Sequence, residues 1–142
     1  MQYSEVIAQM KRRADCLLRG DLDNLVKEYV FPFPVDLLST RLVVCNPEDG
    51  RAMLDLQRKS LIERGVTTLH PEVTAIDLPR TGRLRIWVDW HEMAPTQDAV
   101  RVSSAVYYCS VHGGQLKFEM INYVRLSMPE MQPQFAALAL SA

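Results

Sequence analysis

The sequence predicts an α+β fold in which three helices precede a long antiparallel β meander. Up to residue 65, apolar side chains recur at steps of three and four residues, the spacing of one helix face. After residue 65, runs of alternating apolar and β-branched residues are separated by glycine and proline turns, which is typical of strands. The 142 residues, 48% of them hydrophobic and 23% charged, suffice for one globular core. We assign residues 1–128 to a single domain and residues 129–142 to a C-terminal tail, which either forms a short helix or frays.

Two helices are expected within the first thirty residues. The apolar stripe of Ser4–Arg19 predicts the first helix, and Gly20 suits the left-handed position that ends a helix. Asp21 is the expected N-cap of the second helix, since its carboxylate can accept a free backbone N–H. That helix has to end near Val30, because the Phe31–Pro34 segment contains two prolines, which remove backbone donors and disfavour helix at the preceding residue. This segment should be extended.

The third helix is expected from Asn46 to Gly65. Asn46 is its cap, Pro47 fits the first helical position, and the glycine again marks the C-terminal end. Two short strands are expected between the second and third helices, at Val35–Leu38 and Arg41–Cys45.

The rest of the chain is expected to form the meander, with a break at His70-Pro71 and a hairpin turn at Gly113-Gly114. Side chains of a strand point alternately to its two faces, so the even-numbered residues of the second and last strands make their apolar faces. Asn122 is the polar member of the last of these faces. The expected strands are Val66–Leu78, Arg83–Met93, Val100–Val111 and Gln115–Leu126.

Composition restricts the classes of function. A net charge of −1 and a pI near 6.3 argue against a nucleic-acid partner. No apolar run is long enough for a signal peptide or a membrane span, so we expect a cytoplasmic protein without a membrane partner. The three cysteines contain no CxxC pair, which argues against zinc, and we expect no metal. Glycine-rich phosphate-binding motifs are absent from the sequence, and we expect no cofactor.

Several segments characterise the order of these elements: Gly20–Asp23 with Glu28-Tyr29, Phe31–Val35, Asn46–Asp49, Arg83–Trp90 and Gly113–Leu116. On these segments the chain resembles the nuclear-transport-factor-2-like superfamily, which is also called ketosteroid-isomerase-like or polyketide-cyclase-like. The resemblance covers nearly the whole chain. It implies a cone, in which a curved, mixed sheet wraps around the N-terminal helix, with homodimers formed through the outer sheet face. Some members hold a ligand or an active site in the cone, and others only bind proteins.

Residues expected around an apolar cavity in the cone are aromatic, with a few polar groups. They are Tyr29, Phe33, Trp90, Tyr108 and Asn122. A ketosteroid-isomerase-like site needs a carboxylate base and two proton donors. The candidates are Tyr29 as a donor and Asp36 as the base, but the expected inward register supplies no second acid. The alternative is that Tyr29 belongs to the core and Asp36 is exposed. A dehydratase-like histidine would be His91, which the alternation places on the outer face.

The outer sheet face is expected to carry an amphipathic patch framed by arginines. Aromatic residues and arginine are enriched in interfaces, so this patch predicts a homodimer. The residues of the patch are Trp87, Tyr107, Ile121 and Tyr123.

The sequence is compatible with two functions. The first is binding of an apolar small molecule, or slow proton-transfer chemistry on it. The second is a non-catalytic interaction or scaffold domain, whose cone is filled by Phe118, Met120 and Trp90.

Overall fold

The computed structural model describes residues 1–77, 81–96 and 100–127. The predicted tail, residues 129–142, lies outside these residues. The elements, in chain order, are α1 (Tyr3–Arg19), α2 (Leu22–Val26), β1 (Phe33–Leu37), β2 (Thr40–Val44), α3 (Pro47–Glu63), β3 (Thr68–Ile76), β4 (Arg83–Met93), β5 (Arg101–His112) and β6 (Gln115–Arg125).

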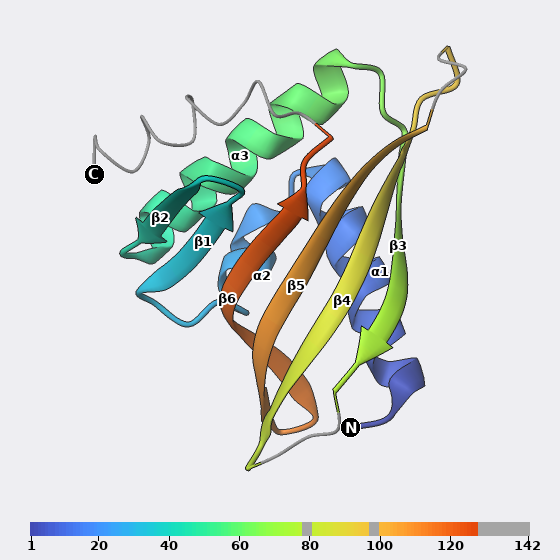
Figure 1. Ribbon diagram of the computed structural model, residues 1–142. Coiled ribbons are helices and arrows are strands. Elements are labelled where there is room, and N and C mark those ends of the chain that lie inside the picture. The colour runs from blue at the N-terminus through green and yellow to red at the C-terminus, as the bar shows by residue number, and fades with distance from the viewer. Residues whose placement is uncertain (78–80, 97–99, 128–142) are drawn as a thin grey trace.

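The six strands form one curved sheet in the order β2-β1-β6-β5-β4-β3. Neighbouring strands are antiparallel except β1 and β6, which are parallel, so the sheet is mixed. The three helices lie on the concave face of the sheet, with α1 along it (Figure 1). The predicted α+β fold, with a curved sheet around the N-terminal helix, is confirmed. No helix within the described ranges is both long and apolar enough to cross a membrane.

The predicted C-terminal end of α1 is correct, whereas its N-terminal end differs slightly from the prediction. Gly20 ends the helix in the left-handed conformation, at φ 81°, as its lack of a Cβ allows. The helix begins at Tyr3, however, one residue before the predicted start at Ser4, and its N-cap is Gln2. Gln2 and Glu5 form a capping box, in which each side chain bonds the backbone of the other residue.

The second helix is shorter than predicted, because its last turn is replaced by a connection to the sheet. α2 ends at Val26 instead of near Val30. Phe118 of β6 donates its backbone N–H to the carbonyl of Glu28 at 2.8 Å, and it accepts the backbone N–H of Val30 at 2.9 Å. These residues after α2 therefore lie beside β6 like a short extra strand.

The third helix begins as predicted. Asn46 caps it by accepting the backbone N–H of Asp49 at 2.9 Å, and Pro47 is the first helical residue.

β3 corrects the predicted break at His70-Pro71. The strand continues through both residues, and Pro71 pairs with Trp90. Because β3 is an edge strand, a proline without a backbone donor is tolerated there. The irregularity lies instead between Val73 and Ala75.

Two bulges in β6 change which of its side chains face the helices. Cys109 pairs with Phe118 but Tyr108 pairs with Met120, so Glu119 is an extra residue. In the same way, Ala105 pairs with Tyr123 and Ser104 pairs with Arg125, so Val124 is also extra. An extra residue breaks the strict alternation of a strand. The predicted inward face of β6, made of even-numbered residues throughout, is therefore right up to Phe118 and again at Leu126, whereas Ile121 and Tyr123 face inward between the two bulges.

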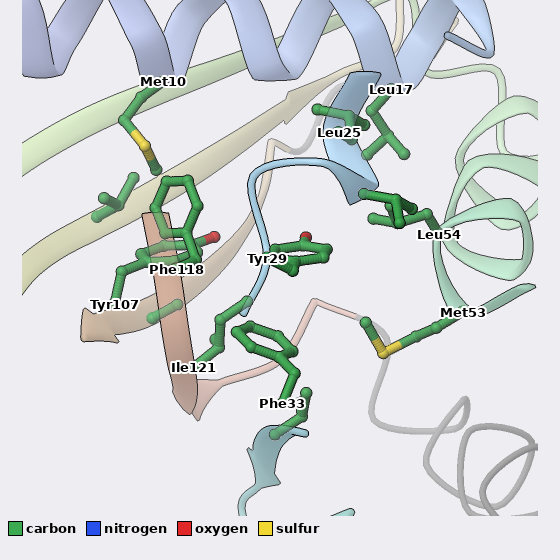
Figure 2. Packing of buried hydrophobic residues seen from close by; sticks show 14 of the residues in the cluster. Met10, Leu17, Leu25, Tyr29, Phe33, Met53, Leu54, Tyr107, Phe118 and Ile121 are labelled. Atoms are coloured by element: carbon green, nitrogen blue, oxygen red, sulfur yellow. The ribbon is translucent and has the colours of Figure 1, made fainter. Parts of the chain in front are cut away.

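The core lies between the concave face and the helices (Figure 2). Tyr29 stacks on Phe33 with ring centroids 4.4 Å apart, and Phe118 packs edge-on against Tyr107 at 5.4 Å. Phe33 and Phe118 are fully buried. These aromatic contacts join the segment after α2 to the middle of the sheet.

Candidate ligand-binding site

A cavity of about 100 Å³ lies between the concave face of the sheet and the three helices. A single water needs roughly 10–15 Å³ by this measure, and an engineered apolar cavity of roughly 150 Å³ binds benzene. The space therefore suits a few waters or a small molecule, whereas drug-sized ligands occupy pockets of roughly 300–1,000 Å³. Most of its wall is apolar, including Leu17, Leu25, Leu37, Met53, Leu54 and Leu61.

Three tyrosines line this cavity, and each phenol oxygen accepts a hydrogen bond from a nitrogen donor. We call Tyr29, Tyr107 and Tyr123 the tyrosine cluster. Arg13 Nη2 donates to Tyr29 at 2.8 Å, and Trp90 Nε1 donates to Tyr107 at 2.7 Å. Gln57 Nε2 donates to Tyr123 at 3.3 Å.

Burial keeps two of these phenols protonated at neutral pH. Burial is the main cause that raises the pKa of Tyr107 well above its ordinary value, and the nearby Tyr123 and Tyr29 add to it. Burial, with the nearby Tyr29, raises the pKa of Tyr123 to about 12. These groups are therefore hydrogen-bond donors rather than bases.

Tyr107 and Tyr123 also share a side-chain hydrogen bond, in which Tyr107 is the donor because the bond lowers the pKa of Tyr123. Within residues 1–77, 81–96 and 100–127, no acceptor is found for the phenolic protons of Tyr29 and Tyr123. A buried donor without a partner is unfavourable by about 1–3 kcal/mol. Two such donors beside an apolar cavity favour the binding of an oxygen acceptor, from a ligand or from water.

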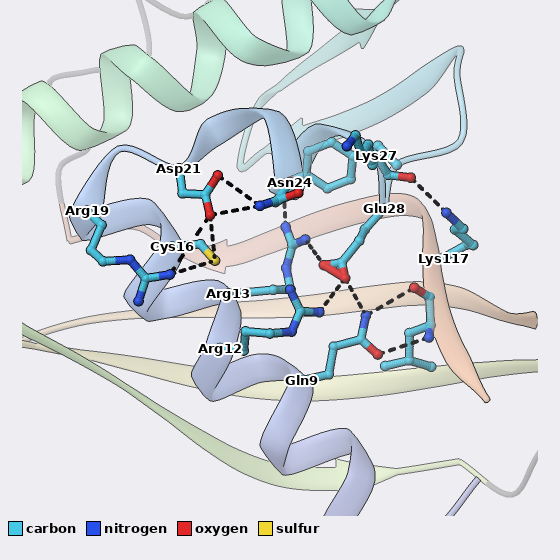
Figure 3. Close-up of polar contacts among 12 residues, drawn as sticks. Gln9, Arg12, Arg13, Cys16, Arg19, Asp21, Asn24, Lys27, Glu28 and Lys117 are labelled. Atoms are coloured by element: carbon cyan, nitrogen blue, oxygen red, sulfur yellow. Dashed lines mark hydrogen bonds and ion pairs between the residues drawn. The ribbon is translucent and has the colours of Figure 1, made fainter. Parts of the chain in front are cut away.

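Arg13, which bonds Tyr29, is also part of a buried ionic network with Glu28 (Figure 3). Arg13 Nη1 forms an ion pair with Glu28 Oε1 at 2.8 Å, and Arg12 Nη2 approaches Glu28 Oε2 at 2.5 Å. Gln9 Nε2 also donates to Glu28, at 3.0 Å. Burial opposes the charge of Arg13, but Tyr29 and Glu28 outweigh this effect and raise its pKa. The guanidinium of Arg13 lies over the ring of Phe118, 4.4 Å from its centroid, which adds a cation–π contact.

Among the described residues, Glu92 is the acidic side chain that lines the cavity. Its side chain is buried and forms an ion pair with Arg64 Nη1 at 2.6 Å. Ser127 Oγ also donates to this carboxylate. A charge buried this deeply needs such partners, because an isolated carboxylate is costly away from water.

The structure brings some of the predicted cavity residues together and separates others. Tyr29 and Trp90 line the cavity. Phe33 lies against Tyr29 in the core and is not among the lining residues. Tyr108 and Asn122 are strand neighbours of inward-facing residues, so they point to the convex face. Their predicted inward register is wrong. For Asn122 the reason is the bulge at Glu119, whereas β5 has no extra residue and the inward face of that strand is the odd-numbered one, with Ala105, Tyr107 and Cys109.

Asp36 is not placed to act as a base in the cavity. It pairs with Asn122 on the adjacent strand, and its two carboxylate oxygens accept hydrogen bonds from Arg41 at 2.6 and 2.9 Å. The hydrogen bond from Arg41 lowers the pKa of Asp36. His91, the dehydratase-like candidate, also lies away from the cavity and contacts Glu72 at 2.9 Å. The described residues contain no cluster of three or more metal-ligating side chains.

The predicted outer patch is also corrected. Tyr107 and Ile121 are buried, with exposed fractions of 4% and 3%, and both line the cavity with Tyr123. These three residues therefore lie inside the fold rather than on its surface. Trp87 alternates with the buried Ile86 and Val88, so it keeps the outward position predicted for it.

Two polar cavity residues that were not predicted, Arg13 and Glu92, occupy positions that a pattern in the sequence marks. Arg13 follows Met10 by three residues and precedes Leu17 by four, so it lies on the apolar stripe of α1. Glu92 continues the alternation that leads to Trp90 on β4. No comparable signal marked Tyr107 and Tyr123, whose orientation depends on the register of β5 and β6.

The comparisons with known proteins agree on the fold. No protein-family model and no curated protein sequence matches this chain. Many solved structures do match, and three of them illustrate the likeness. A nuclear-transport-factor-2-like protein of unknown function from Shewanella oneidensis has a TM-score of 0.65 and 11% identity, over 87% of this chain and 98% of that one. A nuclear-transport-factor-2-like protein with a cystatin-like fold from Novosphingobium aromaticivorans has a TM-score of 0.64 and 12% identity, over 95% of this chain and 86% of that one. ActVI-ORFA from Streptomyces coelicolor has a TM-score of 0.64 and 12% identity, over 87% and 93%. At these identities the likeness shows the fold alone.

Proposed function

We propose that this domain, which has the nuclear-transport-factor-2-like fold, binds a small, largely apolar ring compound that bears an acceptor oxygen. One observation carries the proposal: the phenolic protons of Tyr29 and Tyr123 have no acceptor among the described residues, and both phenols line an apolar cavity. A carbonyl or hydroxyl oxygen placed between them would accept both hydrogen bonds. The fold itself does not decide the function, since one fold supports many.

The size of the cavity restricts the ligand. About 100 Å³ is close to the roughly 150 Å³ of a cavity that holds benzene, so the space fits one ring with small substituents. Leucines and methionine from α1, α2 and α3 provide the apolar contacts for such a ring. A polycyclic ligand would require the walls to move apart.

Proton-transfer chemistry is the finer part of the proposal. Glu92 follows Trp90 by two residues on β4, which places it about 7 Å further along the strand. A ring whose oxygen contacts the tyrosine cluster could present a carbon-bound proton toward the Glu92 carboxylate. Donors at the oxygen and a base at the carbon are what enolisation of a ketone requires.

Ligand-observed NMR tests the binding proposal with three probes of similar shape: acetophenone, 4-hydroxyacetophenone and ethylbenzene. The two ketones should bind more tightly than ethylbenzene, which has no oxygen. The double variant Tyr29→Phe/Tyr123→Phe should remove this preference, because it deletes both free donors. Tyr3→Phe is the matched control, since Tyr3 is exposed and its hydroxyl bonds the backbone of Val73. Equal binding of all three probes to wild type and double variant would contradict the role of the phenols.

Hydrogen–deuterium exchange at the methyl group of acetophenone tests the proton transfer. The exchange should be faster with wild-type protein than in buffer, and Glu92→Gln should lose the acceleration while still binding the ketone. Binding without any acceleration would restrict the function to ligand binding.

The alternative function is a scaffold domain with a filled cone, and one observation favours it. Phe118 is fully buried against Tyr107 and occupies part of the concave face. The other two residues expected to fill the cone do not support it equally, because Met120 pairs with the outward-facing Tyr108 and Trp90 borders the cavity. Absence of saturable binding for every probe, in a folded protein, would favour the scaffold.

A further inference from the structure

The ion pair behind the tyrosine cluster has a defined direction. Arg13 lines the cavity, whereas its partner Glu28 does not. The positive end of the pair therefore faces the cavity, and the negative end faces away from it. The negative end is also neutralised by Arg12, so two guanidiniums surround one carboxylate.

Arg13 is buried in a way that limits the screening of its charge by water. Its side chain is 7% exposed, against 44% for Arg12. Away from solvent, the interaction of a charge with its surroundings is much stronger than in water. Arg13 also donates to the oxygen of Tyr29 at 2.8 Å, which makes the O–H of Tyr29 a stronger hydrogen-bond donor.

The other charged and titratable groups around the cavity do not cancel this effect. The carboxylate of Glu92 is paired with Arg64 at 2.6 Å. Tyr107 and Tyr123 are phenols whose raised pKa values keep them neutral. The cavity is thus apolar, with a buried cation and three phenol groups close to one another.

We infer that this pocket selects ligands whose acceptor oxygen carries a negative charge, such as a phenolate or an aromatic carboxylate, over neutral compounds of the same shape. The inference rests on the proposed function and names its ligand class. Hydrogen bonds to an ionised acceptor are roughly twice as strong as neutral ones. The oxyanion would accept from the phenols of Tyr29 and Tyr123, with Arg13 behind Tyr29 as the stabilising charge.

The probe that tests this inference is 4-nitrophenol, because its phenol and phenolate forms absorb at different wavelengths. Spectrophotometric titration of the probe with excess wild-type protein gives the pKa of the bound form. Phenolate should bind about tenfold more tightly than phenol, which lowers the pKa of the bound probe by about one unit.

Two variants of the ion pair should move this pKa in opposite directions. Glu28→Gln removes the counter-charge of Arg13, so it should lower the pKa of the bound probe further. The double variant Arg13→Met/Glu28→Gln removes both charges without leaving either one buried alone, and it should abolish the preference for phenolate. Arg12→Met is the control: it removes an equal but half-exposed charge and should change the preference by less than about threefold.

The outcomes separate this inference from the proposed function. If the wild-type protein binds 4-nitrophenol only as the neutral phenol, or binds both forms equally, the inference is wrong while ring binding stands. If a neutral ketone binds and the probe does not bind at any pH, the inference is also wrong. If no ring compound binds, the proposed function fails and the inference fails with it. A wild-type shift that persists in Arg13→Met/Glu28→Gln would assign the effect to another group and overturn the role of Arg13.

Discussion

Removing Arg13 should destabilise the fold far more than removing its neighbour Arg12, although both contact the same carboxylate. In the variant Arg13→Met the side chain keeps most of its volume and loses its charge. Glu28 then remains buried, with an exposed side-chain fraction of 11%, and keeps only the donors of Gln9 and Arg12. Tyr29 also loses the hydrogen bond to its oxygen.

The expected cost follows from the burial of the pair. Breaking a buried ion pair by removing one partner usually costs about 3–5 kcal/mol, because the other charge is left uncompensated. Arg12→Met should cost less than about 1 kcal/mol, since the side chain of Arg12 is 44% exposed and surface ion pairs contribute little. Glu28→Gln alone should be costly as well, because it leaves Arg13 unpaired. The double variant Arg13→Met/Glu28→Gln should recover a large part of the loss.

Urea denaturation followed by circular dichroism measures these free energies of unfolding. A domain of this size has about 5–15 kcal/mol of stability, so a loss of 4 kcal/mol is readily measured. The four proteins of the cycle, with Arg12→Met as the control, give the coupling between Arg13 and Glu28. Equal losses for Arg12→Met and Arg13→Met, or a double variant as unstable as the sum of its parts, would refute the reasoning.

Three further predictions concern other parts of the fold. Gln9→Leu should cost about 3 kcal/mol in urea denaturation, because the side-chain amide of Gln9 pairs with both the N–H and the C=O of Leu116; a neutral result would mean that water replaces it. Arg41 lowers the pKa of Asp36 below its ordinary 3.8, so their pair stabilises the fold above pH 3.8 and this stability is lost as the pH falls through the lowered value. Asp36→Asn should therefore make the melting temperature less dependent on pH on the acid side, and an unchanged acid profile would contradict this. The pKa of Tyr123 is raised from 10.0 to about 12, so its contribution to stability is complete below pH 10 and is lost as the pH rises toward 12. Tyr123→Phe should lessen alkaline unfolding measured by circular dichroism, whereas an identical alkaline profile would argue against burial of this phenol.

The fold could be predicted from the sequence because its signals are local. The cap at Asn46 and the glycine at position 20 determine helix ends within a few residues of chain, and both were placed correctly. The early end of α2 was not predictable in this way. It depends on backbone hydrogen bonds between Phe118 and residues 28 and 30, which are about ninety positions away.

The candidate site was less predictable, because strand orientation depends on pairing. Alternation assigns each residue of a strand to a face only while no bulge intervenes. The extra residues Glu119 and Val124 reverse this assignment twice within β6. As a result, Tyr123 was predicted on the surface and lies at the cavity, while Asn122 was predicted at the cavity and points outward. Trp90 lies in the regular part of β4 and was predicted correctly as a cavity residue.

The side chain of Gln9 and the segment after α2 also protect the first half of β6 from other chains. β1 pairs with β6 only at residues 121–123, so the start of β6 would otherwise present free backbone groups. Gln9 bonds Leu116, and residues 28 and 30 bond Phe118, so the backbone groups of both residues are already paired on that side. Unpaired strand edges are sites where a second molecule can add a strand and start aggregation. A helix side chain and a short loop thus close an edge that the sheet itself leaves open.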